Sequence, residues 1–163
     1  MSSFDRRSLL MIPLALAACG FEPVYAPGGT ASGLDGKVRV SAPNSVESYL
    51  LVQNLEQRLG RHAGSGDEYK LNVNVSTVTQ PLAVSTANEI NRYNILGRVN
   101  FSLQSSATGA VLASGEVDNF VSYSAAGSTV DTLADERDAK DRLMVLLADQ
   151  VLARLYSTVD LPA

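Results

Sequence analysis

Alternating apolar and polar residues predict two strands in the middle of the chain. From Tyr69 to Thr77 the odd-numbered positions carry Tyr, Leu, Val, Val and Thr, whereas the even-numbered positions carry Lys, Asn, Asn and Ser. The same period of two returns from Arg92 to Gln104, where Leu96 is the one apolar residue on the polar side. A period of two is typical of a strand with one buried and one exposed face.

A spacing of three and four residues predicts two amphipathic helices. In the first, Asn44 as N-cap and Glu47 form a capping-box pattern, and Gly60 ends the helix. Its apolar stripe comprises Val46, Tyr49, Leu50, Val52, Leu55 and Leu59. The second helix spans about 131–156, and its acidic first turns suit the positive end of the helix dipole. Its stripe comprises Leu143, Leu147, Val151 and Leu155, widened by Met144, Leu146 and Leu152.

Two further strands complete the expected fold. Residues 37–40 form a short first strand, and the turn signal Thr108-Gly109 precedes a fourth strand over about 111–123. The order β-α-β-β-β-α predicts an α+β two-layer sandwich, with a four-stranded mixed sheet and two helices on one face. The core between the layers is expected to contain Leu71, Val73, Val99, Phe101, Leu147 and Val151.

The N-terminus has the features of a lipoprotein signal. Arg6 and Arg7 precede ten apolar residues, 9–18, which as a helix span about 15 Å, half of a bilayer core. That length fits a signal peptide better than a membrane span. Leu16-Ala17-Ala18-Cys19 has the form of a lipobox, so Cys19, the only cysteine, is predicted to be acylated, for example with palmitate. The alternative is an ordinary secretory signal followed by a free thiol; the paired arginines also allow twin-arginine export.

The chain is therefore divided into four parts. Residues 1–18 are the signal peptide, 19–36 the lipidated cysteine and a flexible Gly/Ser/Pro tether, 37–158 a single domain, and 159–163 a C-terminal tail. Without the signal peptide, 11 basic and 16 acidic residues leave a charge of −5, which argues against nucleic-acid binding. By analogy with bacterial sorting, the residue after the cysteine, Gly20, points to the outer membrane.

No pattern of residues points to an enzyme. His62 is the only histidine and lies in a Gly-rich loop, and the GSGD stretch at 64–67 lacks the helix and lysine of a phosphate loop. The acidic residues of the last helix alternate with basic ones, as on a solvated face. We therefore expect no catalytic residues, no metal and no cofactor.

The polar side of the sheet is the candidate binding surface. Lys70, Arg92 and Arg98 all lie on it and are candidate ligands for phosphates or for acidic groups of a partner. The candidate partner-facing residues are Asn72, Asn100 and Ser102. The alternative is a solvated face on which these residues maintain solubility.

The start of the mature chain, Cys19-Gly20-Phe21-x-Pro23-Val24-Tyr25, resembles that of the LptE family of lipopolysaccharide-assembly lipoproteins. Later stretches resemble its alphaproteobacterial branch: Arg92 with Leu96, Phe101-x-Leu103, Thr108-Gly109-x-x-Leu112, Ser122-Tyr123 and the helix ADERDAKDRLMVLLADQVLARL. The chain departs from the family at Val130-Asp131, where Tyr-Ala is expected before the helix.

This resemblance implies a fold and a partner. Such proteins pair two helices with a four-stranded sheet, bind the outer-membrane β-barrel LptD as a plug, and help it to insert lipopolysaccharide into the outer leaflet. Two other classes stay open: an auxiliary lipoprotein of another envelope complex, such as a lipid transporter or an activator of cell-wall synthases, and an enzyme using His62 or the acidic cluster.

Overall fold

Four strands and three helices make up the described part of the chain. The computed structural model describes residues 29–62, 66–84, 90–159 and 161. The elements are α3 (Thr30–Leu34), β1 (Val38–Val40), α4 (Val46–Arg58), β2 (Tyr69–Val84), β3 (Ile90–Ser105), β4 (Val111–Ser124) and α5 (Thr129–Thr158). The predicted α+β fold with a four-stranded mixed sheet is confirmed, and α3 is an additional element.

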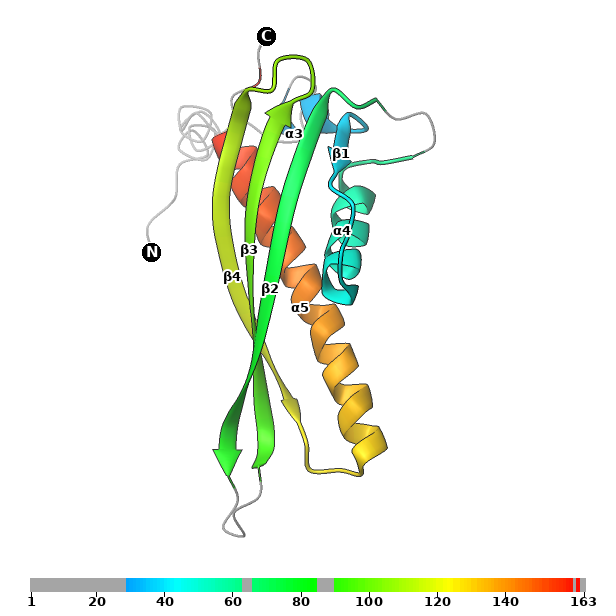
Figure 1. Ribbon diagram of the computed structural model, residues 1–163, viewed down its shortest axis with the longest axis vertical. Coiled ribbons are helices and arrows are strands. Elements are labelled where there is room, and N and C mark those ends of the chain that lie inside the picture. The colour runs from blue at the N-terminus through cyan, green and yellow to red at the C-terminus, as the bar shows by residue number, and fades with distance from the viewer. Residues whose placement is uncertain (1–28, 63–65, 85–89, 160, 162–163) are drawn as a thin grey trace, which may run out of the picture.

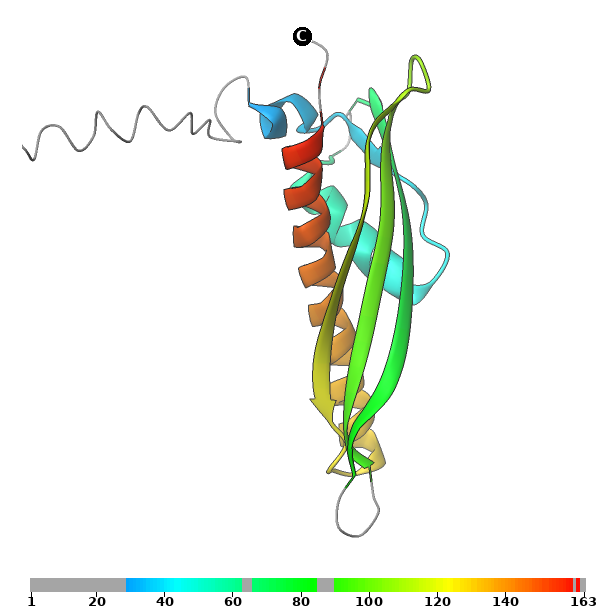
Figure 2. The same ribbon diagram turned by 90° about the vertical axis from the view of Figure 1, so that its left-hand side faces the viewer.

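The strands lie side by side in their sequence order, β1-β2-β3-β4 (Figure 1). β1 pairs parallel with β2 over three residues, from Val38 opposite Tyr69 to Val40 opposite Leu71. A parallel pair needs a crossover connection, and α4 provides it. β2, β3 and β4 form a long antiparallel meander. Figure 1 shows this meander and α5 continuing beyond the end of α4, and Figure 2 shows α5 running alongside the sheet.

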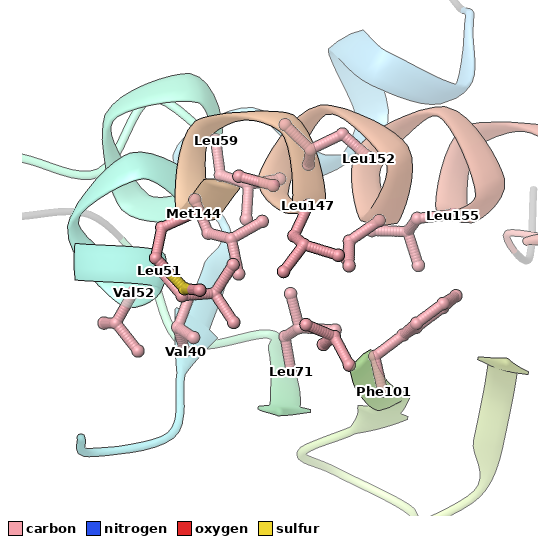
Figure 3. Packing of buried hydrophobic residues seen from close by; sticks show 14 of the residues in the cluster. Val40, Leu51, Val52, Leu59, Leu71, Phe101, Met144, Leu147, Leu152 and Leu155 are labelled. Atoms are coloured by element: carbon pink, nitrogen blue, oxygen red, sulfur yellow. The ribbon is translucent and has the colours of Figure 1, made fainter. Parts of the chain in front are cut away.

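The core lies between the sheet and the helices. In β2, β3 and most of β4 the odd-numbered residues face the helices, as the alternation predicts, and Leu71, Val99 and Phe101 are buried; in β1 it is the even-numbered Val38 and Val40 that are buried. Val73 packs against this core while staying partly accessible. Leu147 and Val151 of α5 are buried on the opposite side of this core, and Figure 3 shows Leu147 facing Leu71. The inner face of the sheet is completed by Ile95, Leu103, Ala113, Val121 and Tyr123.

Helix α4 begins one residue later than predicted. Its N-cap is Ser45 instead of Asn44, and the partner in the capping box is Ser48 instead of Glu47. The Ser45 hydroxyl accepts a hydrogen bond from the Ser48 N–H at 3.1 Å, and the Ser48 hydroxyl accepts one from the Ser45 N–H at 2.8 Å. Gly60 follows the C-cap, Leu59, with a φ of +65°, so the predicted helix stop is confirmed.

The predicted apolar stripe of α4 is wrong in part. Val46 and Tyr49 are 71% and 57% exposed, whereas Leu51, which the prediction left out, is fully buried. Residues 49–52 are all apolar, so their spacing does not determine which of them face inward. The buried residues of this face are Ser48, Leu51, Val52, Leu55 and Leu59.

Helix α5 is longer than predicted by two residues at each end. Its N-cap Ser128 forms a capping box with Asp131, which explains why the chain enters the helix here although it departs from the family pattern. The predicted stripe of Leu143, Leu147, Val151 and Leu155 is fully buried, and Met144 and Leu152 are buried with it. The exception is Leu146, which is 40% exposed and faces away from the core.

The predicted tether is wrong for its described C-terminal part. Residues Thr30–Leu34 form the short helix α3, and Ala31 and Leu34 are buried. The Gly36 N–H donates a hydrogen bond to the Leu59 carbonyl at 2.8 Å, which joins this segment to the end of α4. In the predicted tail, Val159 and Leu161 pack against the core. Apolar side chains therefore tie both flanks of the predicted domain to it.

Candidate functional site

The candidate site is the outer face of the sheet, which the even-numbered residues of the meander form. Their side chains are mostly polar and exposed or half-buried, as the alternation predicts. β2 and β3 contribute Lys70, Asn72, Asn74, Ser76, Gln80, Arg92, Asn94, Arg98, Asn100, Ser102 and Gln104, and β4 contributes Ser114, Glu116, Asp118, Ser122 and Ser124. Because the packed residues are on the other side, this face is available to a partner.

The three predicted cationic residues are exposed and lie far apart on this face. Lys70 is opposite Gln104 near the start of β2, whereas Arg92 is opposite Ser124 at the other end of the meander. Arg98 lies between them, with its Nε 3.4 Å from Oε1 of Glu116. The structure therefore does not bring the cations into one pocket. This agrees with their spacing along the strands, which predicts that they are spread over the length of the face.

The predicted partner-facing residues do lie together. Asn72 is directly opposite Ser102, and Asn100 is the next residue of β3 on the same face. Asn72 and Ser102 are half-buried, and Asn100 is exposed. Short amides and hydroxyls of this kind can exchange water for partner groups at a small desolvation cost.

An apolar row crosses the outer face between the polar group of Asn72, Asn100 and Ser102 and the end of the meander that carries Arg92. Val78 of β2 is opposite Leu96 of β3, which is opposite Phe120 of β4. These side chains are 57%, 39% and 59% exposed. With Arg98 and Asp118 among others they line a shallow hollow of about 340 Å³. Three apolar residues aligned across three strands present a contiguous apolar surface to a partner.

Only part of this row is evident from the local sequence pattern. Leu96 stands out as an apolar residue on the polar side of the predicted strand, whereas Val78 and Phe120 lie outside the stretches whose alternation is clear. Both have even numbers within strands, so extending the alternation past Thr77 and along residues 111–123 would have placed them on the outer face.

Charged groups on the helix side of the sheet have structural roles. Lys140 of α5 bridges Glu136, at 3.0 Å, and Glu47 of α4, at 3.5 Å. Its hydrogen bond with Glu136 raises the pKa of Lys140, with Glu47 adding to the effect and burial opposing it. Burial, and then the charge of Glu136, raise the pKa of the nearby Tyr123 phenol. The Lys140–Glu47 pair connects the two helices, whereas the Lys140–Glu136 pair lies within α5.

The residues considered for catalysis or metal binding do not assemble into a site within the described ranges. The exposed His62 has its Nδ1 2.7 Å from the Gly60 carbonyl oxygen. On α5, Arg142 pairs with Asp138 at 2.9 Å, one turn away. Among residues 29–62, 66–84, 90–159 and 161, no three His, Cys, Asp or Glu side chains gather as metal ligands.

The membrane-related predictions concern residues outside the described part of the chain. The signal peptide 1–18, Cys19 and the family motif that follows it all lie before residue 29. No helix among the described residues is long and apolar enough to cross a bilayer.

The fold occurs in several solved bacterial lipoproteins. A structure of a proposed lipoprotein from Caulobacter crescentus CB15 has a TM-score of 0.66 and 24% identity, with 80% of this chain and 95% of that chain covered. Rare lipoprotein B from Shewanella oneidensis has a TM-score of 0.55 and 13% identity, with 75% and 93% covered. A minor lipoprotein from Acinetobacter baumannii has a TM-score of 0.53 and 16% identity, with 77% and 95% covered.

The family assignment rests on the sequence itself. A search of curated protein sequences found no match. A family model described as "LptE: Lipopolysaccharide-assembly" matches residues 37–155, which include every strand, α4 and most of α5. The chain therefore belongs to the LptE family of lipopolysaccharide-assembly proteins.

Proposed function

We propose that this protein is an outer-membrane lipoprotein that forms a plug-and-barrel complex with LptD and assists assembly of lipopolysaccharide into the outer leaflet. The family match over residues 37–155 carries the proposal. The lipobox ending in Cys19 supports a lipid anchor, since acylation there would hold the domain at the periplasmic side of the membrane.

The outer face of the sheet supports a protein partner with a polar wall. Asn72, Asn100 and Ser102 form a polar group near the start of β2, and the apolar row of Val78, Leu96 and Phe120 lies further along the same face, beyond Ser76 and Arg98. The interior of a large outer-membrane barrel is polar. A face that offers many short hydrogen-bonding side chains and one apolar row suits such a wall.

Arg92 and Arg98 support contact with lipopolysaccharide, whose lipid A carries phosphates. Both side chains are exposed, and a guanidinium can donate two parallel hydrogen bonds to a phosphate. The Arg98–Glu116 pair is about half exposed on each side, and exposed pairs of this kind are weak. A phosphate could therefore replace Glu116 as the partner of Arg98 at little cost.

Site-specific crosslinking tests the LptD complex. A photo-crosslinking residue at position 72, 100 or 102 is expected to trap LptD in outer membranes, whereas one at the exposed helix residues Gln53 or Asp141 is expected to trap much less. Crosslinks to LptD from the helices and none from the sheet would reverse the proposed orientation. Crosslinks only to an ABC complex or a penicillin-binding protein would replace LptD by another envelope partner.

A further inference from the structure

Strand β4 is a long sheet edge with little protection. In the described part of the chain its only strand neighbour is β3. Its 14 residues contain neither proline nor lysine, two residue types that commonly protect edges, and the register shift in its pairing lies at the Val111 end. β2 also has an unpaired edge, because β1 pairs with it only as far as Leu71. That edge carries Pro81, a residue type that protects edges.

The backbone groups on the free side of β4 can be identified from one hydrogen bond. The Phe120 N–H donates to the Asn119 side-chain oxygen at 2.8 Å, so it does not point toward β3. Backbone groups alternate in direction along an antiparallel strand. The backbone N–H and C=O groups of Ser114, Glu116 and Asp118 therefore also point away from β3. At the end of this stretch, the Asn119 side chain already accepts the hydrogen bond of the Phe120 N–H.

A groove runs beside this stretch, between β4 and α5. Glu116, Val117 and Asp118 line it on the strand side, and Gln150, Ala153 and Arg154 line it on the helix side. Its volume is about 390 Å³. The groove thus has room for side chains of an extended segment.

We propose that residues 114–118 of β4 receive an extended segment of a partner protein as an added fifth strand. The main-chain groups of Ser114, Glu116 and Asp118 would pair with the segment. On the outer face the segment would meet the carboxylates of Glu116 and Asp118, which favour lysine or arginine at its alternate positions. Its other side chains would enter the groove beside Ala153 and Arg154. This docking mode is independent of which envelope complex the protein serves.

A synthetic strand tests the proposal on the full chain in detergent. The probe is the acetylated and amidated heptapeptide KVKVKVK, compared with two isomers that are N-methylated either on the last three lysine amides or on the three valine amides. Only one set of amides can face β4, so one isomer is expected to lose binding at least about tenfold more than the other. Slowed amide hydrogen exchange at Ser114, Glu116 and Asp118, measured by NMR, is expected to accompany binding.

Variants of Glu116 provide the matched control on the protein side. Glu116→Pro removes the outward N–H, and Glu116→Ala keeps it, while both remove the carboxylate. The proline variant is expected to bind the peptide about tenfold more weakly than the alanine variant. Equal binding by the two isomers to the unaltered protein would reduce the interaction to charge attraction and overturn the proposal. Absence of peptide binding would overturn it as well. So would slowed amide exchange at residues 114–118 that depends only on protein concentration, because the edge would then pair with a second copy of the chain.

Discussion

A β-carbon on Gly97 of β3 would lie 2.7 Å from Leu147 Cδ1 of α5. The same β-carbon would lie 3.0 Å from Leu143 Cδ2. Real β-carbons essentially never approach other atoms as closely as the first distance, so α5 rests directly on the backbone of β3 at this position. Behind Gly97, on the other face of the sheet, are the neighbouring residues Leu96 and Arg98 of the candidate site.

Gly97→Ala is expected to destabilise the fold by about 1–3 kcal/mol, since the added methyl group must displace Leu147 or Leu143 in a packed core. Urea unfolding followed by circular dichroism measures the change. Gly66→Ala is the matched control, because a β-carbon there has nothing within 4 Å. A Gly97→Ala variant as stable as the Gly66→Ala variant would contradict the close contact.

Leu147→Ala is expected to cost about 2–5 kcal/mol, because the fully buried side chain would leave a cavity between α5 and the sheet. Leu146→Ala, at the adjacent exposed position, is expected to change stability by less than about 1 kcal/mol. Thermal unfolding of both variants measures the difference. Similar losses for the two would mean that α5 is rotated relative to the arrangement described.

Cys19→Ala is expected to abolish acylation and leave uncleaved precursor, since the lipobox would no longer offer a thiol. Mass spectrometry of the membrane fraction measures both the acyl chains and the cleavage site. Ser3→Ala, outside the lipobox, is expected to leave processing unchanged. Cleavage between residues 18 and 19 in the Cys19→Ala variant, with retention in the membrane, would contradict the predicted anchor.

Replacing both Arg92 and Arg98 with serine is expected to weaken binding of purified protein to lipopolysaccharide, with a loss that shrinks as salt rises. The fold is expected to persist because both side chains are exposed. Binding at low and high salt, together with thermal unfolding, checks both statements. Arg137→Ser, at an exposed position of α5, is the control. Unchanged binding at low salt would leave the two arginines without a role in lipopolysaccharide contact.

The N-cap of α5 is expected to contribute a pH-dependent part of stability. Hydrogen bonds from the hydroxyl and then the N–H of Ser128 lower the pKa of the Asp131 carboxyl. Because the folded-state pKa lies below the unfolded value, the stabilisation is complete above the unfolded pKa and is lost as the pH falls through the folded one. Ser128→Ala is expected to raise the pKa of Asp131 in an NMR titration, and Thr129→Ala is not. An unchanged Asp131 titration in Ser128→Ala would contradict this.

The sequence predicts the sheet well because a period of two can be read without ambiguity. Alternation assigns Leu71, Val99 and Phe101 to the core, and they are buried. The same alternation assigns Lys70, Arg92 and Arg98 to the outer face, where they are exposed. In a sheet with one covered face, burial follows from residue parity, so local pattern is enough.

Where the local pattern is ambiguous, tertiary contacts decide. The four consecutive apolar residues 49–52 fit several orientations of α4, and packing against α5 and the sheet buries Leu51 in place of Tyr49. Helix α3 is too short to show a periodicity, and its glycine and serine resemble a linker. It is ordered because Leu34 is buried in the core, a contact that composition does not reveal.

The side chains of Tyr93 and Tyr123 stack at the inner face of β3 and β4, with ring centroids 5.4 Å apart and planes 16° from parallel. The chain has no tryptophan and six tyrosines, so its near-ultraviolet optical activity comes chiefly from tyrosine. Asymmetrically packed aromatic rings produce this signal only while tertiary packing persists. The protein therefore carries an intrinsic spectroscopic reporter between its sheet and α5. Loosening of that contact would be visible as a lost near-ultraviolet band before the far-ultraviolet signature of the helices changes.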